Sequence, residues 1–66
     1  MAKRLYLREM REARGMTQAD LAQEADCTQA YISVLEHGKH KPSREMLARL
    51  ADALGCRVCE LMREEA

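Results

Sequence analysis

The chain has 66 residues, which leaves room for one domain, expected to span residues 1–66. Its 11 basic and 11 acidic residues cancel to a formal net charge of zero, so any binding to nucleic acid cannot rest on an overall positive charge. The sequence has neither an apolar run long enough for a membrane span nor a secretory signal. We therefore expect a cytoplasmic protein, with no membrane partner, whose three cysteines stay reduced.

Good helix formers dominate the composition and long β-branched runs are absent, so the chain is predicted to be all-α. A first helix is expected over residues 3–14. Gly15 is placed to end it, because glycine adopts the left-handed conformation that follows many helices. Thr17 is a candidate N-cap for a second helix. After a break at residues 26–28, Thr28 is the matching candidate for a third.

The second half of the chain carries the same start and stop signals. The third helix, at about residues 28–37, stops at Gly38. Ser43 is the N-cap of a fourth helix, which Gly55 ends, and a short fifth helix covers about residues 59–64. We therefore expect a compact five-helix domain with no sheet and no strand pairing longer than two residues.

The short break between the second and third helices is typical of a helix-turn-helix, because so few residues force two helices to cross steeply. Small and apolar residues occupy the positions where this pair must sit on a core: Leu21, Ala22, Ala25, Cys27, Ile32 and Leu35. The first residues of the third helix are left on the outer face, from which they can enter a DNA major groove.

Other short motifs agree with this interpretation. They are TQADLA at residues 17–22, ISVLEHGK at 32–39 and LADALG at 50–55. Together they resemble the Cro/repressor-type helix-turn-helix family of phage and bacterial regulators, over residues 11–61. The resemblance implies a lambda repressor-like fold and a sequence-specific DNA-binding transcription regulator. Our first hypothesis is a repressor that binds palindromic operator DNA as a homodimer, with the third helix in the major groove.

The resemblance also assigns roles to single positions. The side chains expected to read base edges are Gln29, Ala30, Ser33 and Val34. Glutamine can pair with adenine, while alanine and valine can meet a thymine methyl group. The side chains expected at DNA phosphates are Gln18, Thr28, Lys39 and Lys41. A structural ion pair is expected between Arg11 and Glu36, and the dimer interface is expected at Val58, Cys59 and Met62.

Three positions depart from the family's pattern. Asp26 stands in the turn where the family usually has glycine, and aspartate tolerates the left-handed conformation better than most residues. Arg57 stands where a serine-like cap often starts the last helix, so that helix is the least secure element. His40 stands where basic residues are frequent, which would make the affinity for phosphate depend on pH.

Two rival functions stay open beside DNA binding. The first is a protein-interaction module on the same fold, such as an antitoxin-like partner-binding protein, and the neutral charge favours it. The second is a metal-responsive regulator, since Cys56, Cys59, His37 and His40 could ligate zinc. We expect no metal site, because free cysteine behaves as a small buried apolar residue. No catalytic set is recognisable, so no enzyme, cofactor or small-molecule substrate is expected.

Overall fold

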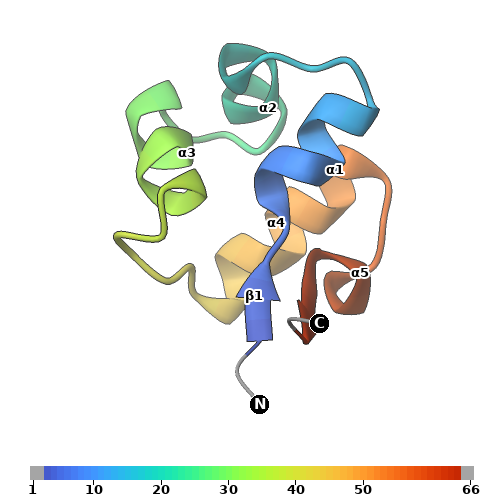
Figure 1. Cartoon of the computed structure of the whole chain (residues 1–66). Helices are drawn as coiled ribbons and strands as arrows, with labels where there is room; N and C mark the ends of the chain where they lie inside the picture. Colours follow the sequence, from blue (N-terminus) through green and yellow to red (C-terminus); the bar gives the residue numbers. More distant parts are fainter. Residues whose placement is uncertain (1–2, 65–66) are drawn as a thin grey trace.

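Five helices and one two-stranded ribbon make up residues 3–64, the part of the chain that the computed structural model describes. The outer limits of the predicted domain, residues 1–2 and 65–66, lie outside the described residues. In Figure 1, α1 and α4 lie at the centre, α2 and α3 cover one end, and α5 lies beside the ribbon at the other. In chain order the elements are β1 (Lys3–Leu5), α1 (Leu7–Ala13), α2 (Gln18–Glu24), α3 (Gln29–Glu36), α4 (Arg44–Leu54), α5 (Val58–Leu61) and β2 (Met62–Glu64).

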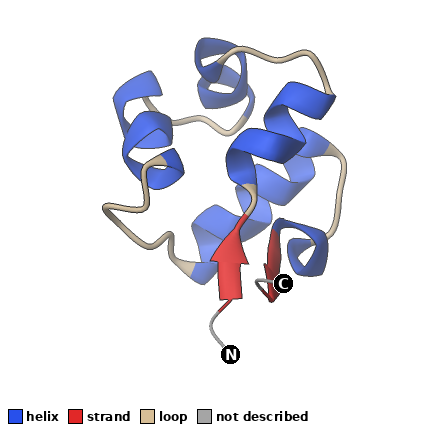
Figure 2. Ribbon diagram, viewed as in Figure 1, coloured by secondary structure: helices blue, strands red, loops and turns tan. Residues whose placement is uncertain are grey.

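The five predicted helices are all present, but the expectation of no sheet is wrong. Strands β1 and β2 pair in antiparallel fashion over three residues each, with Leu5 opposite Met62 and Lys3 opposite Glu64. The strands lie side by side in Figure 2. As a result, α1 begins only at Leu7 and α5 ends at Leu61, so the predicted helices at 3–14 and 59–64 were too long at the chain ends.

The ribbon forms because the fold brings residues 3–5 and 62–64 together. The backbone N–H of Tyr6 donates to the carbonyl of Leu61 at 2.8 Å, which continues the pairing beyond the strands. Arg4 and Arg63 lie opposite each other, and like charges in that position repel. The Tyr6 ring offsets this repulsion, because the guanidinium carbons of Arg4 and Arg63 lie 4.7 and 4.1 Å from its centroid.

Hydroxyl caps begin three of the helices, as the sequence predicts. The Thr17 hydroxyl accepts a bond from the N–H of Asp20 at 3.0 Å, and the Asp20 carboxylate accepts one from the N–H of Thr17 at 3.0 Å. This capping box satisfies two backbone donors that helix geometry leaves free. The hydroxyls of Thr28 and Ser43 cap α3 and α4 in the same way, each at 3.1 Å.

The core is aliphatic and draws on every helix. Its largest fully buried side chains are Leu7, Leu21, Ile32, Leu35, Leu50 and Leu61. Burying each such side chain stabilises the fold by roughly 1.5–3 kcal/mol before entropy is counted. Cys27 and Cys56 are half-buried against this core and Cys59 is exposed, and burial raises the pKa of the Cys27 and Cys56 thiols. No helix in residues 3–64 is both long and apolar enough to cross a membrane.

Candidate DNA-binding surface

The turn between α2 and α3 sets the angle at which α3 leaves the domain. It runs from Ala25, the C-cap of α2, to Thr28, the N-cap of α3. Asp26 has a φ of 58°, the left-handed conformation expected where the family has glycine. The N–H of Cys27 then donates to the Ala22 carbonyl at 2.9 Å. Ala22 is 4% exposed, and so small a side chain lets the two helices approach closely.

A residue of α4 braces the turn from outside. Arg49 donates from its guanidinium to the Asp26 carbonyl at 2.6 Å and lies 3.6 Å from the Asp26 carboxylate. The sequence alone gives no sign of this contact, because no local pattern connects positions 23 residues apart. The brace ties the orientation of α3 to the body of the domain.

The far end of α3 is held by the ion pair expected there. Arg11 Nε donates to Glu36 Oε2 at 2.7 Å, and a second guanidinium nitrogen lies 3.3 Å from Oε1. The Glu36 side chain is 4% exposed and that of Arg11 is 11% exposed. Arg11 also donates to the Met16 carbonyl at 2.7 Å, and Gln18 Nε2 donates to Glu36 Oε1 at 3.0 Å. One carboxylate thus joins α1, α2 and α3.

The protonation of this network follows from its contacts. Burial alone would raise the pKa of the Glu36 carboxyl, but hydrogen bonds from Arg11 and Gln18 outweigh burial, and the pKa is lowered. The hydrogen bond to Glu36 raises the pKa of the Arg11 guanidinium in turn. Both groups therefore stay charged at neutral pH, and neither adds a free charge to the surface.

The outer face of α3 carries the residues expected to read bases. Gln29 and Ala30, in its first turn, are exposed, and Val34 is 36% exposed. Ser33 is half-buried, and His37 Nδ1 donates to its carbonyl at 2.7 Å. This face is uncharged and presents an amide, two apolar groups and a hydroxyl.

The residues expected at phosphates surround this face. Thr28 is exposed at the start of α3, and Lys39 and Lys41 are exposed in the loop that follows it. Gln18 is half-buried at the start of α2, where its bond to Glu36 orients it. Between residues 27 and 42 the charged side chains are Glu36, which Arg11 neutralises, and the two lysines. The free charge of this segment is therefore positive although the chain is neutral.

The remaining candidates lie elsewhere. Val58 is 40% exposed at the start of α5, Cys59 is exposed beside it, and Met62 is half-buried in β2. His40 is exposed in the loop after α3, and its ring packs edge-on against that of Tyr31, with the centroids 6.1 Å apart. Within residues 3–64, no three histidine, cysteine or acidic side chains are grouped so that they could hold a metal ion.

Known proteins share this arrangement. Residues 7–61 match the family described as Helix-turn-helix. The chain belongs to the helix-turn-helix family. It is 41% identical over 56 residues to the HTH-type transcriptional regulator DdrOP3 of Deinococcus deserti, and these residues cover 85% of this chain and 43% of that one. It is 32% identical over 59 residues to the immunity repressor of Bacillus phage phi105, which covers 89% of this chain and 41% of the repressor.

A solved structure extends the likeness to the whole fold. The P22 c2 repressor, determined in complex with a synthetic operator, superposes with a TM-score of 0.81 at 27% identity, over 89% of each chain. The lambda repressor-like class is thereby established for this helix-turn-helix module. The chain spans less than half the length of the two curated relatives. One relative is named a transcriptional regulator and the other an immunity repressor, and neither name describes an enzyme.

Proposed function

We propose that this helix-turn-helix module binds double-stranded DNA as a sequence-specific transcription regulator in the cytoplasm, with α3 in the major groove. The observation that carries the proposal is that contacts hold α3 at both of its ends. One end is fixed by the braced turn at Asp26 and the other by the buried carboxylate of Glu36. Only an uncharged face with hydrogen-bonding and apolar groups is left outward, which is what base edges require.

Two sets of residues are proposed to contact DNA, one at base edges and the other at phosphates. Gln29, Ala30, Ser33 and Val34 are the residues proposed to read bases, because they share the outer face of α3. Gln18, Thr28, Lys39 and Lys41 are proposed to position the module on phosphates. Thr28 and Gln18 stand at the starts of α3 and α2, where the helix dipole favours an anion. The two exposed lysines add positive charge.

We further propose repression through a homodimer on a palindromic operator. One such module reads only a few base pairs, and two on a two-fold axis would read half-sites about 34 Å apart. The contact is proposed at Val58, Cys59 and Met62, which belong to α5 and β2; Figure 1 shows these elements at the other end of the module from α3. The patch is small, so the free dimer is expected to be weak and to assemble on DNA.

The test of the proposed function is a pair of single variants on DNA. Selection of bound duplexes from a random library first supplies the site and its half-site spacing. Gln29→Ala is then expected to cost ~1–3 kcal/mol on that site and to relax preference at one base pair per half-site. Lys39→Ala is expected to weaken all duplexes alike and to lower the salt slope by about one unit.

Two results would contradict the proposal. If no duplex bound even at low salt, the protein-interaction module with an antitoxin-like partner would take its place, because non-specific affinity for phosphate would be missing. If Gln29→Ala and Lys39→Ala behaved identically across sequences, the division between reading and positioning residues would be wrong.

A further inference from the structure

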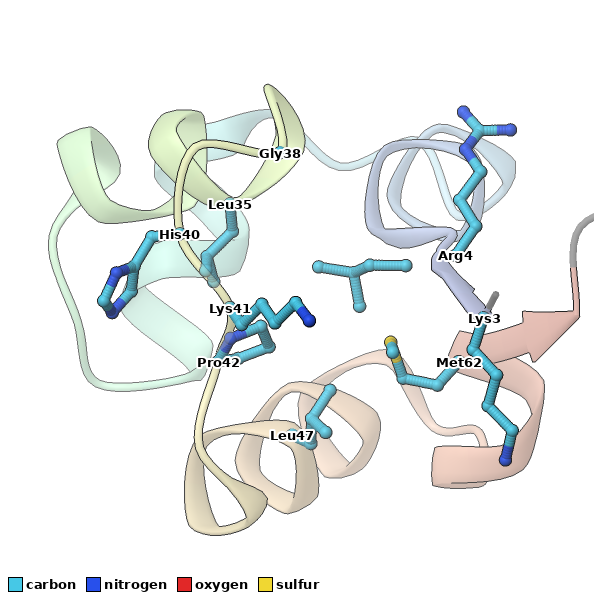
Figure 3. Close-up of a pocket in the computed structure, with 10 residues that line it drawn as sticks. Lys3, Arg4, Leu35, Gly38, His40, Lys41, Pro42, Leu47 and Met62 are labelled. Atoms are coloured by element: carbon cyan, nitrogen blue, oxygen red, sulfur yellow. The ribbon is translucent and has the colours of Figure 1, made fainter. Parts of the chain in front are cut away.

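A groove on the side of the module lies apart from the outer face of α3 and shares only Lys41 with the proposed DNA contacts. It has a volume of about 580 Å³ and lies between the α3–α4 loop, α4 and the ribbon of β1 and β2 (Figure 3). Sites for small molecules in proteins typically occupy about 300–1,000 Å³.

The wall of the groove is mostly apolar. Leu35 is 2% exposed, whereas Leu5, Pro42, Leu47 and Met62 are half-buried and keep part of their surface open to the groove. In Figure 3 the side chains of Leu47 and Met62 extend into the space. An aliphatic chain laid there would remove this surface from water, which is favourable in proportion to the area covered.

The charged residues of the groove are all of one sign. Lys3, Arg4 and Lys41 line it, with Arg4 paired to Glu9 at 2.7 Å, and among the described residues no aspartate or glutamate lines it. In Figure 3 the ammonium group of Lys41 extends over the groove, whereas Lys3, Arg4 and His40 turn away from it. A neighbouring hollow of about 300 Å³ differs, because Glu9 and Glu36 line it. Acidic and basic residues are equal in number in the chain, so a groove lined by basic residues without acidic ones does not follow from the overall composition.

We propose that this groove binds a small amphipathic carboxylate, with its aliphatic chain among the apolar residues and its carboxylate on Lys41. A second copy of the chain fits less well, because a two-fold contact centred here would bring the Lys41 ammonium groups of the two copies close together. DNA fits less well too, since a phosphate backbone has no apolar part to cover Leu47 and Met62.

Occupancy of the groove has a consequence for DNA, and this part rests on the proposed function. Lys41 is one of the two loop lysines proposed to contact phosphate. A carboxylate that engages its ammonium group removes that charge from DNA, because one point charge cannot serve both anions at full strength. The ligand would therefore act as an inducer that weakens DNA binding without touching the outer face of α3.

The first experiment needs no DNA. Octanoate is titrated into the full chain while backbone amide chemical shifts are followed by NMR, with octanol and acetate as matched probes. Octanoate is expected to shift the amides of Gly38, Lys41, Leu47 and Met62 most, with octanol and acetate binding about tenfold or more weakly. Absence of saturable shifts at these residues would overturn the site. Equal binding of octanol would overturn the role of the charge.

Three variants separate the groove from the DNA surface. Lys41→Gln is expected to bind octanoate about tenfold more weakly. Lys39→Gln, an exposed lysine outside the groove, is expected to bind octanoate as the parent does. Leu47→Gln is expected to lose octanoate and to keep its DNA affinity. Circular dichroism verifies that each variant folds, and since Lys41 is exposed its replacement leaves the core intact. Equal loss in the two lysine variants would overturn the proposal.

Competition with DNA is measured last, on the selected duplex. Octanoate is expected to lower the DNA affinity of the parent and of Lys39→Gln, and to leave that of Lys41→Gln unchanged. If octanoate binds but DNA affinity does not respond, the inducer role is overturned while the groove site stands. If no duplex binds at all, the proposed function fails, and the NMR titration still decides the groove on its own.

Discussion

The ion pair between Arg11 and Glu36 should dominate the response of this domain to mutation. Arg11→Met keeps much of the aliphatic stem of the side chain and removes the guanidinium. The Glu36 carboxylate, 4% exposed, then keeps only the bond from Gln18 at 3.0 Å. Removing one partner of a buried pair typically costs 3–5 kcal/mol, because the other charge is left uncompensated. The remaining Gln18 bond places the expected loss near the lower end, at about 3 kcal/mol.

That loss is large for a chain of 66 residues. At roughly 0.05–0.15 kcal/mol per residue, its whole free energy of unfolding is about 3–10 kcal/mol. In a domain of this size each kcal/mol moves the melting temperature by about 4–8 °C, so Arg11→Met is expected to lower Tm by about 12–24 °C. Thermal and urea unfolding followed by circular dichroism measure both quantities.

Arg8→Met is the matched control on the same helix. Arg8 pairs with Glu12 at 3.3 Å, but the two side chains are 67% and 55% exposed. Such a surface pair contributes about 0.3–0.5 kcal/mol, so the control should barely change Tm. The double variant of Arg11→Met and Glu36→Met is expected to recover much of the lost stability, since it removes the orphan charge. A loss in Arg11→Met within about 1 kcal/mol of the control would refute the reasoning.

Three more predictions concern pH, the turn and the dimer. The pKa of Glu36 is lowered in the folded state, so its charge stabilises the fold above pH 4.5, the ordinary pKa of a glutamate, and this stability is lost as pH falls through the folded-state pKa. Glu36→Gln lacks this carboxylate, so on acidification its urea midpoint should fall less than that of the parent. Asp26→Gly should raise the free energy of unfolding by about 0.5–1 kcal/mol, because φ is 58°; a lower urea midpoint would contradict this. Val58→Glu should weaken the dimer on a palindromic operator in sedimentation, and unchanged two-to-one binding would exclude that interface.

Local chemistry made much of the fold predictable from the sequence. The caps at Thr17, Thr28 and Ser43 each bond to an N–H three residues ahead, so the whole interaction lies within one turn of helix. The buried positions Leu21 and Ile32 were predicted from helical spacing for the same reason. The outward face of α3 could also be predicted, because it is what remains once the apolar side is assigned.

Contacts between distant residues were decided by the tertiary structure alone. The ribbon joins residues 3–5 to residues 62–64. Taken alone, each of these short segments is as compatible with a helix as with a strand, and only their pairing makes them strands. The Arg49 brace on Asp26 and the Lys41 groove arise in the same way. Helical periodicity determines which side of each segment is buried, but it holds no information about which segments become neighbours at the surface. That choice depends on how the whole chain packs its shared core.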